Sequence, residues 1–181
     1  WRAGVPHGHS SPCIFGDKIA LTGVDAGRLV TFCLSKTDGH ELWRVTAPAD
    51  KLEPTHRIGS PAAQTCCTDG ERLVACFGSF GVLAYDWNGK ELWRRPLPPP
   101  VVEFGTGASP VIADGKVIIV ADQDVGSYML ALDVKTGAEV WRVDRSEFRR
   151  GFSTPFIWRH DGIEELVVCG FLSRLHALRL A

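Results

Sequence analysis

A repeated six-residue pattern constrains this chain more than any other feature of its sequence. Gly-x-Glu-(Leu/Val)-Trp-Arg occurs three times, and its tryptophans are separated by 50 and 48 residues. A fixed period of this length is typical of repeat folds, in which each unit packs against its neighbours. The three copies are Gly39–Arg44, Gly89–Arg94 and Gly137–Arg142.

Two further landmarks recur in the same order. A Ser-Pro or Thr-Pro pair opens each unit, at Ser11-Pro12, Ser60-Pro61, Ser109-Pro110 and Thr154-Pro155. A Gly/Asp pair, which favours a tight turn between two strands, follows each of them. These pairs are Gly16-Asp17, Asp69-Gly70, Asp114-Gly115 and Asp161-Gly162.

Each unit has the pattern of four short β-strands. In the third unit they are expected at residues 109–113, 116–122, 128–133 and 139–143, where apolar and β-branched residues alternate with turn residues. No window keeps a helical apolar period. Four strands with a period in the forties predict an all-β protein, a β-propeller of four-stranded antiparallel blades. We expect about four blades, the last incomplete, in one domain over residues 1–181, with units at about 8–45, 59–95, 107–143 and 152–181.

The third unit resembles a known repeat. Its residues 131–141, Ala-Leu-Asp-Val-Lys-Thr-Gly-Ala-Glu-Val-Trp, match A-x-D-x-x-T-G-x-x-x-W, the repeat of pyrroloquinoline-quinone (PQQ) type propellers. The second unit has one residue fewer at 84–93, and the first has drifted at 33–43. The resemblance covers nearly the whole chain, and it implies a fold rather than a function.

The motif has a physical role in the blade. Its glycine supplies the positive φ of a tight hairpin, and its indole is expected to pack between neighbouring blades. We therefore assign blade docking to Gly39, Gly89, Gly137, Trp43, Trp93 and Trp141.

The ends of the chain do not complete a ring. Trp1-Arg2 resembles the end of a preceding outer strand, and residues 176–181 stop before a Thr-Gly turn and a tryptophan. We expect a fragment of a longer propeller. The alternatives are a compact four-bladed ring and an edge-to-edge dimer of two chains, because open sheet edges invite pairing.

Loops on one mouth of the central channel hold the candidate binding residues. The loops that join an outer strand to the next blade, at 46–58, 95–106 and 143–152, share a face with those at 24–28, 78–81 and 122–127. Cationic side chains there suit an anion or an acidic partner, whereas a solvated surface with local ion pairs is the alternative. The candidates are His56, Arg57, Glu103, Asp122, Asp124, Arg149 and Arg150.

Composition narrows the classes of function. The 20 basic and 21 acidic residues nearly cancel, which disfavours nucleic-acid binding. No stretch suits a membrane span, and no signal segment is expected within this chain. None of the six cysteines has zinc-site spacing. Some PQQ-dependent alcohol dehydrogenases carry a disulfide between adjacent cysteines over the cofactor; Cys66-Cys67 lies elsewhere in its unit, so packed thiols are expected and no metal site.

No catalytic triad, P-loop or dinucleotide fingerprint occurs. We therefore expect a non-catalytic scaffold without a cofactor, similar to the BamB family that supports outer-membrane assembly. Its loop face would bind a protein partner or small ligand, in the periplasm or cell envelope. The alternatives are a fragment of a PQQ-dependent dehydrogenase, which requires PQQ with calcium, and a carbohydrate-binding or small-ligand-binding propeller.

Overall fold

The computed structural model describes residues 1–170 and 174–180, and within them every regular element is a β-strand. The strands form four antiparallel sheets, each a meander in chain order, of which the fourth has three described strands. This confirms the predicted all-β fold with four-stranded blades and an incomplete last blade. The first sheet is β1 (Cys13–Phe15), β2 (Lys18–Asp25), β3 (Arg28–Ser35) and β4 (Glu41–Thr46), and the second is β5 (Cys67–Thr68), β6 (Leu73–Phe77), β7 (Gly81–Tyr85) and β8 (Glu91–Pro96). The third is β9 (Val111–Ala113), β10 (Lys116–Ala121), β11 (Tyr128–Asp133) and β12 (Glu139–Asp144), and the fourth is β13 (Phe156–His160), β14 (Ile163–Gly170) and β15 (Arg174–Arg179).

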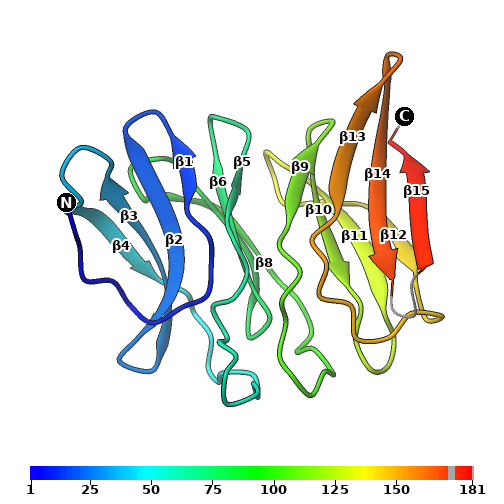
Figure 1. Ribbon diagram of the computed structural model, residues 1–181, viewed down its shortest axis with the longest axis horizontal. Coiled ribbons are helices and arrows are strands. Elements are labelled where there is room, and N and C mark those ends of the chain that lie inside the picture. Colours follow the sequence, from blue (N-terminus) through cyan, green and yellow to red (C-terminus); the bar gives the residue numbers. More distant parts are fainter. Residues whose placement is uncertain (171–173, 181) are drawn as a thin grey trace.

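The sheets follow one another along an arc (Figure 1). Their first strands are neighbours in series, because β1 contacts β5, β5 contacts β9, and β9 contacts β13. The first and fourth sheets lie at opposite ends of the molecule (Figure 1). The four sheets therefore form an open arc, and the alternative of a compact four-bladed ring is wrong for this structure.

Apolar clusters between successive sheets make the core. Every residue of β6 and β7 is buried, since the second sheet has a neighbour on both faces. This explains why these strands are continuous apolar runs without polar alternation. Leu73, Leu83 and Tyr85 pack towards the first sheet, while Val74 and Val82 pack towards the third.

Indoles join the first sheet to the second, and the second to the third, through the same contact. Trp43 and Trp93 lie against Gly89 and Gly137 of the following sheet, where an added Cβ would be 2.8 and 2.5 Å from the indole. Their indole N–H groups donate to backbone carbonyls of the same hairpins, at 3.1 Å and 3.0 Å. Trp1 lies in the same way on Gly39 and donates to the Lys36 carbonyl at 2.9 Å. Trp141 belongs to the cluster between the third and fourth sheets.

A second contact, made by hydroxyl groups, joins the sheets near their first strands. The backbone N–H of Ser11 donates to Thr65 Oγ1 at 2.9 Å, that of Thr65 to Ser109 Oγ at 2.8 Å, and that of Ser109 to Thr154 Oγ1 at 3.0 Å. We call this series the hydroxyl ladder. Each of these residues lies two positions before its first strand. In the second unit Thr65 therefore takes the position that the Ser-Pro landmark had given to Ser60.

Candidate functional site

The loops gather on one edge of the arc, the lower edge in Figure 1, which we call the loop face. It combines the β2–β3, β6–β7 and β10–β11 loops with the segments that precede each first strand. We call these the lead-in segments, and they comprise residues 1–12, 47–66, 97–110 and 145–155. Each lead-in ends at the first strand of its sheet, and these first strands are neighbours in series, so the four lead-ins approach one another along this edge.

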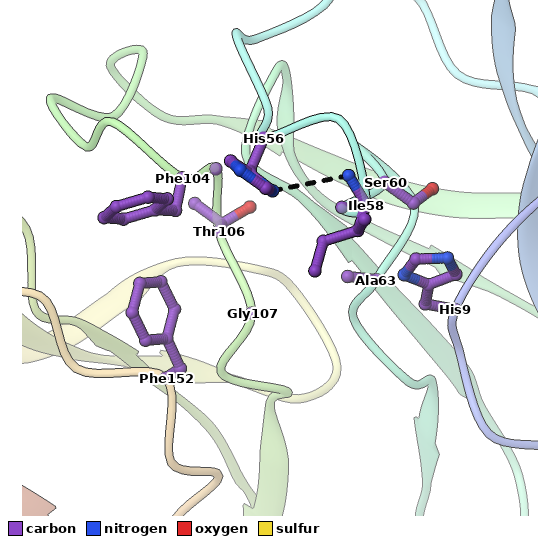
Figure 2. A pocket seen from close by; sticks show the side chains of 11 residues that line it. His9, His56, Ile58, Ser60, Ala63, Phe104, Thr106, Gly107 and Phe152 are labelled. Carbon is purple, nitrogen blue, oxygen red and sulfur yellow. Dashed lines mark hydrogen bonds between the residues drawn. The ribbon is translucent and has the colours of Figure 1, made fainter.

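A hollow of about 440 Å³ opens where the lead-ins meet. Figure 2 shows His56, Phe104 and Phe152 around this space, with Ile58 and His9 on its other side. None of its lining side chains is a carboxylate, lysine or arginine. The full lining is His9, His56, Ile58, Gly59, Ser60, Ala63, Phe104, Gly105, Thr106, Gly107 and Phe152.

Large apolar side chains around the hollow reach solvent. Ile58 is 72% exposed, Phe104 is 41% exposed and Phe152 is 45% exposed. The His56 ring lies tilted against Phe104 at 6.0 Å between centroids, and the Ile58 N–H donates to His56 Nδ1 at 3.4 Å (Figure 2). Clustered exposure of this kind typically marks a binding surface.

Glu53 holds one wall of the hollow in place. Its carboxylate accepts hydrogen bonds from Thr106 Oγ1 at 2.7 Å and from the Thr106 N–H at 3.1 Å. Its own N–H donates to Ser79 Oγ at 2.8 Å. Burial raises the pKa of the Glu53 carboxyl, and the bonds from Thr106 offset part of that shift. Glu53 thus ties the second lead-in to the third.

Three of the predicted site residues come together beside Phe104. Arg150 forms ion pairs with Asp124 and with Glu103, the latter at 3.1 Å, and its guanidinium lies 5.5 Å from the Phe104 ring centroid. The predicted His56 lines the hollow itself. Arg57 and Arg149 are exposed, and neither forms an ion pair with a described residue.

Asp122 lies inside the protein rather than on the loop face. Its side chain has no exposed surface, and both of its oxygens accept hydrogen bonds from Arg145, at 2.7 and 2.8 Å. Arg145 also lies over the Phe148 ring, 4.2 Å from its centroid. The pair fastens the β10–β11 loop to the fourth lead-in, so we leave Asp122 out of the candidate surface.

Sequence reasoning left the apolar residues of the lining out of the candidate site. Ile58, Phe104 and Phe152 stand in segments rich in glycine and proline, outside any strand pattern. A large apolar residue in such a segment is the available signal, because it is not needed for the core of a sheet.

The cysteines are free thiols packed within the fold, apart from the exposed Cys169. Burial raises the pKa of the Cys13 thiol to about 11 and that of Cys76 to about 12, which leaves them protonated and unreactive at neutral pH. Within the described ranges, no three histidine, cysteine or acidic side chains gather as metal ligands. Nor do those ranges contain a helix long and apolar enough to cross a membrane.

Four meandering sheets, joined by stacked indoles around a shared loop face, define an arc of a β-propeller built from PQQ-type repeats. A family model described as outer membrane protein assembly factor BamB matches residues 25–181. The chain belongs to this BamB family, as its repeat had indicated.

Individual relatives agree with that assignment. The chain is 30% identical over 140 residues to outer membrane protein assembly factor BamB of Alkalilimnicola ehrlichii, a match covering 76% of this chain and 33% of that protein. It therefore spans about a third of its curated relative. Among solved structures, BamB from Moraxella catarrhalis is similar with a TM-score of 0.61 at 20% identity, over 96% of this chain and 48% of that one. The quinohemoprotein alcohol dehydrogenase ADHIIG from Pseudomonas putida HK5 reaches 0.68 at 15% identity, over 94% and 30%. At these identities the structural likeness shows the fold alone.

Proposed function

We propose that this chain is part of a non-catalytic scaffold that binds a protein of outer-membrane assembly through its loop face, outside the cytoplasm. The observation that carries the proposal is the open hollow, free of lysine, arginine and carboxylate side chains, to which all four lead-in segments contribute. Membership of the BamB family supports the kind of partner, since its relatives carry the name of an assembly factor.

The surroundings of the hollow resemble those of protein interfaces. Such interfaces combine an apolar centre with a polar rim, and aromatic residues and arginine are enriched in them. Here Ile58, Phe104 and Phe152 are the centre, while Arg149 and Arg150 stand on the same lead-in as Phe152. A protein partner that covers this centre removes exposed apolar surface from water, which is the main favourable term in association.

Photo-crosslinking in living bacterial cells tests this proposal. A photoreactive amino acid at position 58 or 152 is expected to capture a protein of the outer-membrane assembly apparatus, identified by mass spectrometry. The control is Ile14, which is 53% exposed next to the β1–β2 turn on the opposite edge. Absence of that protein from positions 58 and 152, or equal capture from position 14, overturns the proposal.

The described residues do not suit a quinone site with calcium. Calcium requires several oxygen ligands, yet the carboxylates near the hollow are engaged by other groups. Glu53 is engaged by Thr106, Asp122 by Arg145, and both Glu103 and Asp124 by Arg150. We therefore derive no redox step within this chain. The dehydrogenase alternative predicts saturable PQQ binding with calcium and dye reduction, and absorbance titration of the purified protein measures both.

The exposed face of the fourth sheet is a second surface to test. Phe156 is 65% exposed, Trp158 47% and Leu175 64%. An edge-to-edge dimer would cover these side chains, and light scattering after size-exclusion chromatography would then give twice the monomer mass.

The remaining alternative is a small ligand bound in the hollow. Such a ligand would raise the melting temperature of the protein in a thermal-shift screen.

A further inference from the structure

We propose that the hollow receives one bulky apolar side chain of an extended, acidic segment of the partner protein. This inference rests on the proposed scaffold function and adds the chemistry of the group that is bound. Three observations carry it: the lining, the spread of exposed apolar surface, and the balance of charge on the walls.

The lining selects an uncharged apolar group. About 440 Å³ lies within the range of roughly 300–1,000 Å³ typical of ligand sites. Phe104 and Phe152 stand on one side and Ile58 on the other (Figure 2). A charged side chain placed there would lose its hydration and would find no lysine, arginine or carboxylate among the lining residues.

Further exposed apolar side chains lie on the loop face outside the hollow, which favours an extended occupant over a compact small molecule. Val101 is 54% exposed and Val125 is 70% exposed. Their loops are joined, because the Asp124 N–H donates to the Val101 carbonyl at 2.7 Å and the Val101 N–H donates to Gln123 Oε1 at 3.0 Å. A polypeptide segment can fill the hollow with one side chain and cover this neighbouring surface with the next ones.

The charge balance favours acidic residues in that segment. On the second and fourth lead-ins, Glu53 is engaged by Thr106, and Glu147 pairs with Arg174 at 3.0 Å. Asp50 and Lys51 are adjacent and opposite in charge. Among the charged residues of these two segments, Asp50, Lys51, Arg57 and Arg149 are exposed and form no ion pair with any residue the structure describes, which leaves three cations and one anion. Arg57 and Arg149 are the two of these that matter for the hollow. Each stands close in sequence to a residue that lines the hollow, so carboxylates flanking the inserted side chain can reach them.

Fluorescence anisotropy with three labelled peptides tests the inference on the purified protein. The first peptide has a central phenylalanine between glutamates in a Gly/Ser background, the second replaces the phenylalanine by alanine, and the third replaces the glutamates by lysines. The first is expected to bind at least roughly tenfold more tightly than either of the others, because it alone has both the apolar group and the charge.

Matched variants locate the binding. Ile58→Asp is expected to weaken binding of the first peptide by roughly tenfold or more, whereas Ile14→Asp on the opposite edge leaves it unchanged. The pair Arg57→Glu with Arg149→Glu is expected to reverse the preference between acidic and basic peptides, and Lys135→Glu, in an exposed hairpin, serves as its control. Circular dichroism confirms that each variant is folded.

Two results overturn the inference. One is equal binding of the phenylalanine and alanine peptides; if position 58 still captures an assembly protein in cells, the scaffold function stands and only the inserted side chain is wrong. The other is sedimentation with anionic phospholipid vesicles that depends on Ile58 while no peptide binds, which identifies a membrane as the occupant. Failure of the crosslinking itself removes the scaffold function as well.

Discussion

At the scale of single residues, glycine is required in the docking hairpins for two separate reasons. Gly137 has φ of +71°, a conformation that side chains disfavour, and it also lies directly under Trp93. Gly115 shares the first property, with φ of +66°, but nothing lies within 4 Å of the Cβ that a substitution would add. The two positions therefore separate backbone strain from steric overlap.

We expect Gly137→Ala to destabilise the protein more than Gly115→Ala. The left-handed conformation costs each variant roughly 1–2 kcal/mol, and overlap with the buried indole adds about 1–3 kcal/mol for Gly137→Ala alone. Urea unfolding followed by tryptophan fluorescence measures the difference. Equal losses at the two positions would show that the indole does not press on this glycine.

The buried Asp122–Arg145 pair gives a second expectation at this scale. Arg145→Met leaves a buried carboxylate without its partner and is expected to cost about 3–5 kcal/mol of unfolding free energy. Adding Asp122→Asn to Arg145→Met removes the orphaned charge, so the double variant should regain part of the loss. Thermal unfolding of the two variants compares them; no recovery would mean that the arginine acts mainly by packing against Phe148.

At the scale of elements, the strands were easier to predict than the segments between them. β11 begins and ends where its apolar pattern does, because that pattern reflects burial on both faces. β9 begins at Val111 instead of the expected residue 109, since the Ser109 N–H donates to Thr154 and Pro110 has no N–H to donate. The missing N–H of Pro110 can be read from the sequence, whereas the bond from Ser109 to the next sheet cannot.

The difference between strands and the segments that connect them also explains which parts of the candidate site could not be predicted. The loop face could be placed from the order of strands, but its surface could not. Asp122 and Asp124 flank the same glutamine, yet one is buried against Arg145 and the other pairs with Arg150 near the surface. The difference comes from the fourth lead-in, because its Arg145 is buried against Asp122 whereas its Arg150 lies nearer the surface against Asp124. The hollow depends in the same way on how four distant lead-ins meet.

The hydroxyl ladder gives an expectation at this scale. Thr65→Ala and Ser109→Ala each remove an acceptor between neighbouring sheets and are expected to lower the unfolding free energy by about 1 kcal/mol. Thr37→Ala, at an exposed position, is the control and is expected to change it little. Chemical denaturation resolves such differences. Losses as small as that of the control would exclude the ladder from the forces that hold the sheets together.

At the scale of the whole molecule, each sheet depends on its neighbours for burial. The second and third sheets have apolar clusters on both faces, whereas the fourth is packed on one and exposes Phe156 and Leu175 on the other. Stability in repeat architectures is roughly a sum of unit and interface contributions. It should therefore vary along the arc.

Hydrogen exchange of the isolated chain is expected to show this gradient. Backbone amides of β6, β7, β10 and β11 should exchange most slowly, while those of β15 should exchange faster, because local opening there exposes less apolar surface. Mass spectrometry of peptic fragments gives the protection of each strand. Uniform protection across all sheets would instead indicate a single cooperative unit.

The repeated indole contact has an evolutionary consequence. Trp1, Trp43 and Trp93 each pack on a glycine hairpin further along the chain, so the first and second units each receive an indole on one side and supply one on the other. A gene segment that encodes one unit can be copied in tandem, and the new copy already fits both of its neighbours. Propellers with different numbers of blades can thus arise by duplication, without the invention of a new interface.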